Sequence, residues 1–151
     1  MSYLKHNSWG RTRSPKNIAG DPGTAVALEA DLTNLKSGAT GYKGTGYKTE
    51  NQRFLHVLVT DAHAAAPAAV TVFGYCHAFQ RWFELPQAFD PVGANSGPTA
   101  ASITVGDSGA AATAQAPSDT EYRVYEIVGI DRVAFVGADA NVDVYAACST
   151  F

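Results

Sequence analysis

At 151 residues, the chain has the length of a single domain that can bury a hydrophobic core. Its 11 Lys and Arg residues against 14 Asp and Glu residues give a net charge of −3, which argues against a dedicated nucleic-acid binder, because such proteins neutralise phosphates. No run approaches the ~20 apolar residues that cross a bilayer, and none near the N-terminus is typical of a signal peptide. We therefore expect a soluble protein that is synthesised in a cytoplasm and does not contact a membrane.

Residues 1–24 predict an extended N-terminal arm. Glycine and proline interrupt this segment five times, and it carries four cations against one anion, a charge of +3 beside −6 for the rest of the chain. Too few apolar groups are present to offset the entropy of ordering it alone, so we expect the arm to be mobile in the free protein. It would become ordered against an acidic neighbouring subunit, with the following residues in contact: Tyr3, Leu4, Trp9, Arg11 and Arg13.

Residues 25–151 predict one β-sandwich domain without a convincing helix. Residues 25–32 alternate apolar and polar side chains, which is typical of a half-buried strand, and residues 53–60 place Leu55, Val57 and Val59 on one face. Further strands rich in β-branched and aromatic residues are predicted at 69–83 (one long strand or a bent pair), 121–128, 130–136 and 141–149. Within the Gly- and Ala-rich excursion 92–118, only SITV can form a short strand.

The loop GADAN at 137–141 has the length of a hairpin connection. It predicts that the last two strands are antiparallel neighbours. Asp131 and Arg132 would then form a cross-strand charge pair with Asp143.

The segment TGYKGTGYK at 40–48 repeats Thr-Gly-Tyr-Lys. The glycines predict an exposed, flexible loop in which Tyr42 and Tyr47 contact a partner. Stacking of these rings on a sugar or a base is the alternative.

The run GYCHAFQRWFEL at 74–85 raises the question of a catalytic or metal site. Neighbouring side chains of a strand point to opposite faces, so Cys76 and His77 cannot act as a nucleophile and its base. Both faces of this strand are apolar, which predicts that the second face meets another layer, a covering arm or another subunit. Phe79, Trp82 and Phe83 are accordingly predicted as core or interface anchors.

No pattern predicts catalysis, a cofactor or a metal. The four histidines lack the spacing of zinc ligands, and no Gly-x-Ser-x-Gly motif is present. His56 or His77 is predicted to form an inter-strand hydrogen bond. Cys76 and Cys148 are predicted to be free thiols.

The runs LEADLTNLKSGATGYKG, RFLHVLVTDA, VTVFGYCHAFQRWFELP and YRVYEIVGIDRVAFVGADANVDVYAACSTF resemble the small β-sandwich virion proteins of tailed bacteriophages, in particular capsid decoration (cement) proteins. The resemblance covers roughly residues 25–151 and rests on strand order, not on a diagnostic motif. It implies an all-β antiparallel sandwich of the jelly-roll type, made in the host cytoplasm, without catalytic residues.

Such a protein would bind the major capsid protein on the outer face of the virion, associate with itself as a homotrimer or homodimer, and not bind nucleic acid directly. The alternative is a carbohydrate- or receptor-binding module of a tail fibre or baseplate that uses its Tyr and Trp residues. The third hypothesis, after these two, is an enzyme.

Overall fold

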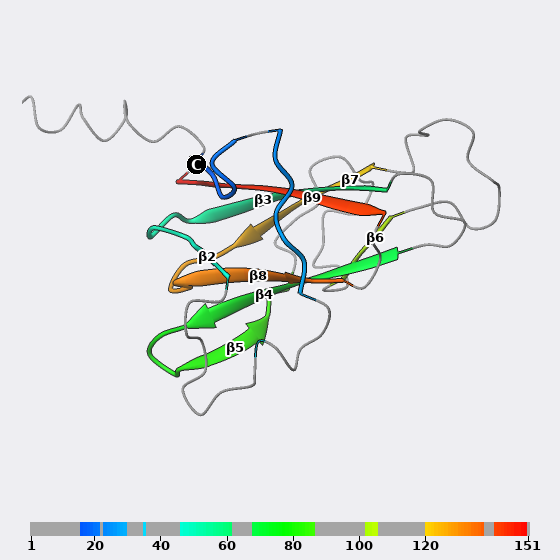
Figure 1. The fold of residues 1–151 in the computed structure, drawn as a ribbon. Coiled ribbons are helices and arrows are strands. Elements are labelled where there is room, and N and C mark those ends of the chain that lie inside the picture. The colour runs from blue at the N-terminus through cyan, green and yellow to red at the C-terminus, as the bar shows by residue number, and fades with distance from the viewer. Residues whose placement is uncertain are drawn as a thin grey trace, which may run out of the picture.

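The computed structural model describes residues 16–21, 23–29, 35, 46–61, 68–86, 102–105, 120–137 and 141–150. These residues form nine strands in two antiparallel sheets, so the expected all-β class is confirmed (Figure 1). The strands are β1 (Lys16–Asn17), β2 (Tyr47–Lys48), β3 (Phe54–Asp61), β4 (Ala68–Cys76), β5 (Arg81–Glu84), β6 (Ser102–Val105), β7 (Thr120–Glu126), β8 (Arg132–Val136) and β9 (Val142–Ser149).

The strand pairing is nested along the chain. The first sheet has the order β1-β9-β3-β7 and the second has the order β2-β8-β4-β5, with β6 beside the first half of β4. The outermost strands of the sequence therefore pair with each other (β1 with β9), followed inward by β2 with β8, β3 with β7 and β4 with β5. The chain thus folds like one long hairpin whose strand pairs alternate between the two sheets.

This nesting overturns the prediction that the last two strands are neighbours. β8 belongs to the second sheet and β9 to the first, so the connection at 137–141 passes between sheets. A five-residue loop of this composition can either close a hairpin or cross from one sheet to the other. The predicted charge pair of Asp131 and Arg132 with Asp143 on an adjacent strand is therefore wrong.

The core lies between the two sheets, where β-branched side chains alternate inward along the strands. Leu55, Val57 and Val59 of β3 are fully buried, as the period-2 pattern predicts. Val70 and Val72 of β4 and Phe135 of β8 meet them from the second sheet. Burial of each such side chain stabilises the fold by about 1.5–3 kcal/mol.

Of the two alternatives predicted for the run at 69–83, one long strand or a bent pair, the structure has the bent pair, formed by β4, a turn at 77–80 and β5. The outer face of β4 is covered within the chain, because Phe73 is buried with Leu35 and Tyr75 packs against Trp82 of β5, with ring centroids 5.4 Å apart. A subunit contact is therefore not needed to bury Phe73 and Tyr75. His77 lies in the turn, not on the strand.

Residues 25–29 do not form the regular strand that alternation predicts. This segment runs from one sheet to the other: the Val26 nitrogen donates to the Val144 oxygen of the first sheet (2.7 Å), and the Glu29 nitrogen donates to the Phe135 oxygen of the second (2.8 Å). These two backbone donors are thereby satisfied without a continuous ladder, apart from one bridge between Glu29 and Val136.

The predicted boundary of the N-terminal arm at residue 24 is also wrong. Lys16–Asn17 pairs with β9, and Ile18 and Ala19 pack against the core. From Lys16 onward the chain is therefore part of the sandwich. The predicted arm residues before it lie outside the described residues.

Candidate functional site

Three β-turns gather at one end of the sandwich, on the left in Figure 1. They connect β2 to β3 (49–52), β4 to β5 (77–80) and β7 to β8 (127–130). Each turn is closed by a backbone hydrogen bond across four residues, with N···O distances of 3.1, 3.2 and 3.0 Å respectively.

Asp131 connects these turns. Its backbone oxygen accepts a hydrogen bond from the nitrogen of Thr49 (3.1 Å), and its own nitrogen donates to the oxygen of Tyr75 (2.9 Å). Its carboxylate accepts from the backbone nitrogen of His77 (2.7 Å). Asp131 is therefore bonded to the first turn, to the end of β4 and to the second turn, instead of forming the pair with β9 that the sequence predicts.

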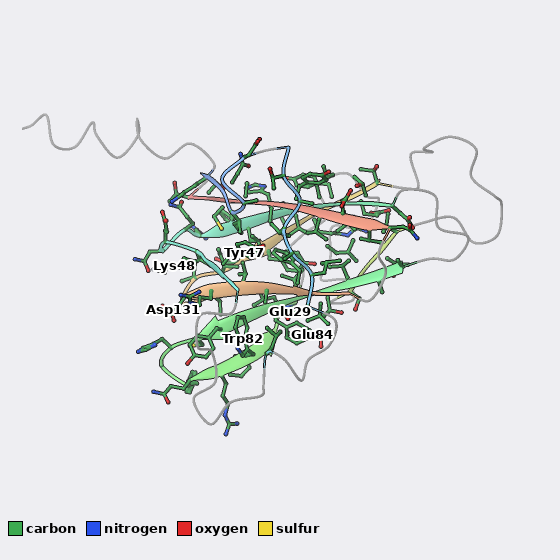
Figure 2. The ribbon with its side chains drawn as sticks, viewed as in Figure 1. Glu29, Tyr47, Lys48, Trp82, Glu84 and Asp131 are labelled. Atoms are coloured by element: carbon green, nitrogen blue, oxygen red, sulfur yellow. The ribbon has the colours of Figure 1, made fainter. Side chains whose placement is uncertain are left out.

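A polar pocket of about 270 Å³ opens between the turns. It is lined by Lys48, Glu50, Asn51, Tyr75, His77, Asp131 and Arg132. Lys48 and Arg132 lie directly opposite each other on the paired strands β2 and β8, and Figure 2 shows Lys48 and Asp131 at this same end. One guanidinium nitrogen of Arg132 donates to the backbone oxygen of Gly46 (3.0 Å), which fixes part of that side chain.

The turn at 49–52 has an unusual backbone. Glu50 and Asn51 both have positive φ, 53° and 59°, which is the sign that both central residues of a type I′ turn require. This turn favours Asn-Gly, and a non-glycine residue in this region costs about 1 kcal/mol. The carboxylate of Glu50 pairs with the ammonium group of Lys16.

The sequence predicts an inter-strand hydrogen bond for His56 or His77 and a charge pair for Asp131 and Arg132, and it does not predict the pocket. Asn51, which shortly precedes the β-rich run 53–60, was a usable turn signal. The remaining lining residues come from strands and turns that are distant in sequence, so their assembly depends on the sheet order.

The predicted partner-binding aromatics lie in different environments. Tyr47 is half-buried: its ring packs 6.3 Å from that of Phe135, and its hydroxyl accepts a hydrogen bond from the nitrogen of Ala27 (2.8 Å). The expected exposed loop is therefore wrong at Tyr47, which holds the segment 25–29 in place. Tyr42 and the arm residues Tyr3, Leu4, Trp9, Arg11 and Arg13 lie outside the described residues.

The β4–β5 hairpin, in contrast, carries exposed aromatic rings. Phe79 is 71% exposed and Phe83 is 44% exposed. The two rings meet edge to face, with centroids 6.4 Å apart. Trp82 is half-buried against Tyr75 and acts as a core anchor of the hairpin.

His56 lies in a hydrogen-bonded row across the first sheet. Nδ1 is 2.6 Å from the hydroxyl of Tyr122, and Nε2 is 2.7 Å from Oγ of Ser149. Burial lowers the pKa of His56. The predicted inter-strand hydrogen bond of a histidine is confirmed here, and because Ser149 is fully buried this row offers no accessible nucleophile.

Both cysteines are free thiols, as predicted. Cys76 lies on β4 and Cys148 on β9, in different sheets. Burial raises the pKa of Cys148 to about 11, with a smaller contribution from the charge of Glu50. Within the described ranges, no group of His, Cys, Asp and Glu side chains could hold a metal ion, and no helix is long and apolar enough to cross a membrane.

The fold and its three-turn end define an antiparallel, two-sheet β protein with a polar pocket and an exposed aromatic hairpin. Comparison with protein-family models, with curated proteins and with solved structures finds no match.

Proposed function

We propose that this protein is a structural component of a phage particle, a decoration protein that binds the outer surface of the assembled capsid. The observation that carries the proposal is the nested pairing of β1 with β9, β2 with β8, β3 with β7 and β4 with β5. The nested pairing supports the jelly-roll type that we propose, a fold used by viral capsid and lectin domains. The fold alone does not determine function, so the proposal also depends on an exposed surface that can contact another protein.

The exposed pair of Phe79 and Phe83 supports attachment to another protein. Exposed aromatic rings on one hairpin are typical interface anchors, because they bury large area with little loss of side-chain entropy. Arg81 and Glu84 are exposed on the same strand and would supply a polar rim. We assign this surface, residues 79–84, to the contact with the major capsid protein.

The N-terminal residues would supply a second contact. Tyr3, Leu4 and Trp9 are apolar, and Arg11 and Arg13 are basic, which fits an acidic neighbouring subunit. The capsid shell would also position a neighbouring copy of this chain, so that the protein forms a homotrimer or homodimer.

Binding to undecorated shells of the parent phage tests this proposal. The full chain should co-sediment with the shells, and the double variant Phe79→Ser/Phe83→Ser should bind at least about tenfold more weakly, as expected for loss of an aromatic anchor. Leu58→Ser is the matched control, because Leu58 is an exposed apolar residue (36%) on the first sheet. Equal binding of the double variant and the control would contradict the assignment, and absence of binding by the full chain would contradict the function.

A further inference from the structure

The lining of the three-turn pocket includes two arrangements that cost stability. Lys48 and Arg132 are like charges directly opposite each other on paired strands, an arrangement that destabilises a sheet. Glu50 and Asn51 are consecutive non-glycine residues with positive φ. Both features line the same pocket, and such unfavourable local geometry is concentrated at functional sites.

We propose that the pocket binds one neutral sugar unit of a glycan through its hydroxyl groups. The lining holds two cations, Lys48 and Arg132, and two carboxylates, Glu50 and Asp131, so that its formal charge is zero with His77 neutral. The amide of Asn51 adds both a donor and an acceptor. Each sugar hydroxyl both donates and accepts hydrogen bonds, and a lining that offers both functions can satisfy it.

The same lining disfavours other ligand classes. A phosphate or other compact anion would meet the carboxylates of Glu50 and Asp131 as well as the two cations. An apolar ligand would take water away from the charged groups without offering them new hydrogen bonds. A volume of about 270 Å³ is just below the roughly 300–1,000 Å³ of pockets for drug-sized ligands, which suits a single sugar ring.

The pocket is also held in shape before a ligand arrives. Asp131 bonds to Thr49, Tyr75 and His77, so the ends of the turns do not move independently. Lys16 pairs with Glu50, and Gly46 accepts a hydrogen bond from Arg132. Preorganisation of this kind lowers the entropic cost of binding.

The test uses the isolated full chain, without capsids, so that its result is separate from the proposed attachment. Amide spectra of ¹⁵N-labelled protein are recorded during titration with a panel of neutral hexoses, their N-acetylated forms, a uronic acid and inorganic phosphate. We expect saturable shifts, with a Kd on the order of 1 mM for one neutral sugar, confined to residues 48–51, 77 and 131–132.

Two variants, together with one control variant, assign the binding to the pocket. Asn51→Gly removes the amide and relieves the positive φ, so it should fold at least as stably and bind the sugar about tenfold more weakly. Gln80→Gly is the matched control: Gln80 also has a positive φ of 52° in a turn, but it does not line the pocket, so binding should be unchanged. Lys48→Gln should also weaken binding.

Three results would overturn the proposal. The first is the absence of saturable shifts with every neutral sugar at tens of millimolar. The second is stronger binding of the uronic acid or of phosphate than of any neutral sugar. The third is full affinity in both Asn51→Gly and Lys48→Gln.

Discussion

His56 and Ser149 are joined across β3 and β9, with Nε2 of the imidazole 2.7 Å from the buried hydroxyl oxygen of Ser149. The other ring nitrogen lies 2.6 Å from the hydroxyl of Tyr122. A single imidazole therefore connects three strands of the first sheet. This arrangement gives the buried hydroxyl group of Ser149 a hydrogen-bond partner across the strands, as buried polar groups require.

The same row predicts a loss of stability in mild acid. Burial lowers the pKa of His56 below the ordinary value of 6.5, so the unfolded chain binds a proton before the folded chain does. The stability contribution is complete above pH 6.5 and is lost as the pH falls towards the lowered pKa of the folded state. Urea unfolding between pH 8 and pH 5 should show this fall.

His56→Gln is the control, because it removes the titrating group and should flatten the slope just below pH 6.5. His56→Ala at pH 7.5 should cost about 1–3 kcal/mol, since the hydroxyl groups of Ser149 and Tyr122 both lose their hydrogen bonds to the imidazole. An unchanged slope in His56→Gln would show that another group causes the pH dependence.

Gly46→Ala should be strongly destabilising. Gly46 has a φ of 78°, and an added Cβ would lie 2.6 Å from the oxygen of Val133 and 2.9 Å from the ring of Trp82. We expect a loss of more than about 2 kcal/mol in urea unfolding, the sum of backbone strain and overpacking. Gly129→Ala separates the two causes: its φ is 79°, but the space around it is open, so only the strain should appear. Equal losses in both variants would exclude the close approach as a cause.

Tyr125→Phe should leave stability unchanged or raise it by up to about 1 kcal/mol. The hydroxyl of Tyr125 is buried and has no hydrogen-bond partner in the described part of the chain, and burial raises its pKa. Tyr122→Phe is the matched comparison, because it removes a hydroxyl that is bonded to His56 and should cost about 1 kcal/mol. Thermal unfolding of both variants at pH 7.5 measures the difference, and a clear loss of stability in Tyr125→Phe would contradict this account.

Two N-terminal deletions should differ in their effect on the fold. Removing residues 2–15 should leave the far-ultraviolet circular dichroism and the melting temperature unchanged but weaken attachment to undecorated shells. Removing residues 2–20 also deletes β1 and the core contacts of Ile18 and Ala19, and should lower stability by about 2 kcal/mol or more. Equal melting temperatures in the two deletions would contradict the role of Lys16–Asn17 as an edge strand.

Local pattern by itself determined the all-β class and several strands of this protein. The alternation of Leu55, Val57 and Val59 is sufficient to predict a strand and its buried face, because side chains point to opposite faces with a period of two. The free thiols and the short strand SITV were also predictable from composition, whereas the pattern at 69–83 left one long strand and a bent pair as alternatives.

Only the tertiary structure decided which strands are neighbours. The five-residue connection at 137–141 could close a hairpin or cross between the sheets. The nested pairing shows that it crosses, because β8 and β9 belong to different sheets. The same pairing brings Lys48 opposite Arg132 across 84 positions of sequence and places Asp131 between three turns. Likewise, Tyr47 is half-buried because Phe135 and Ala27 are adjacent to it in space. Residue type and period act over a few neighbouring positions, whereas a pocket depends on contacts between distant segments, which form only when the whole core is packed.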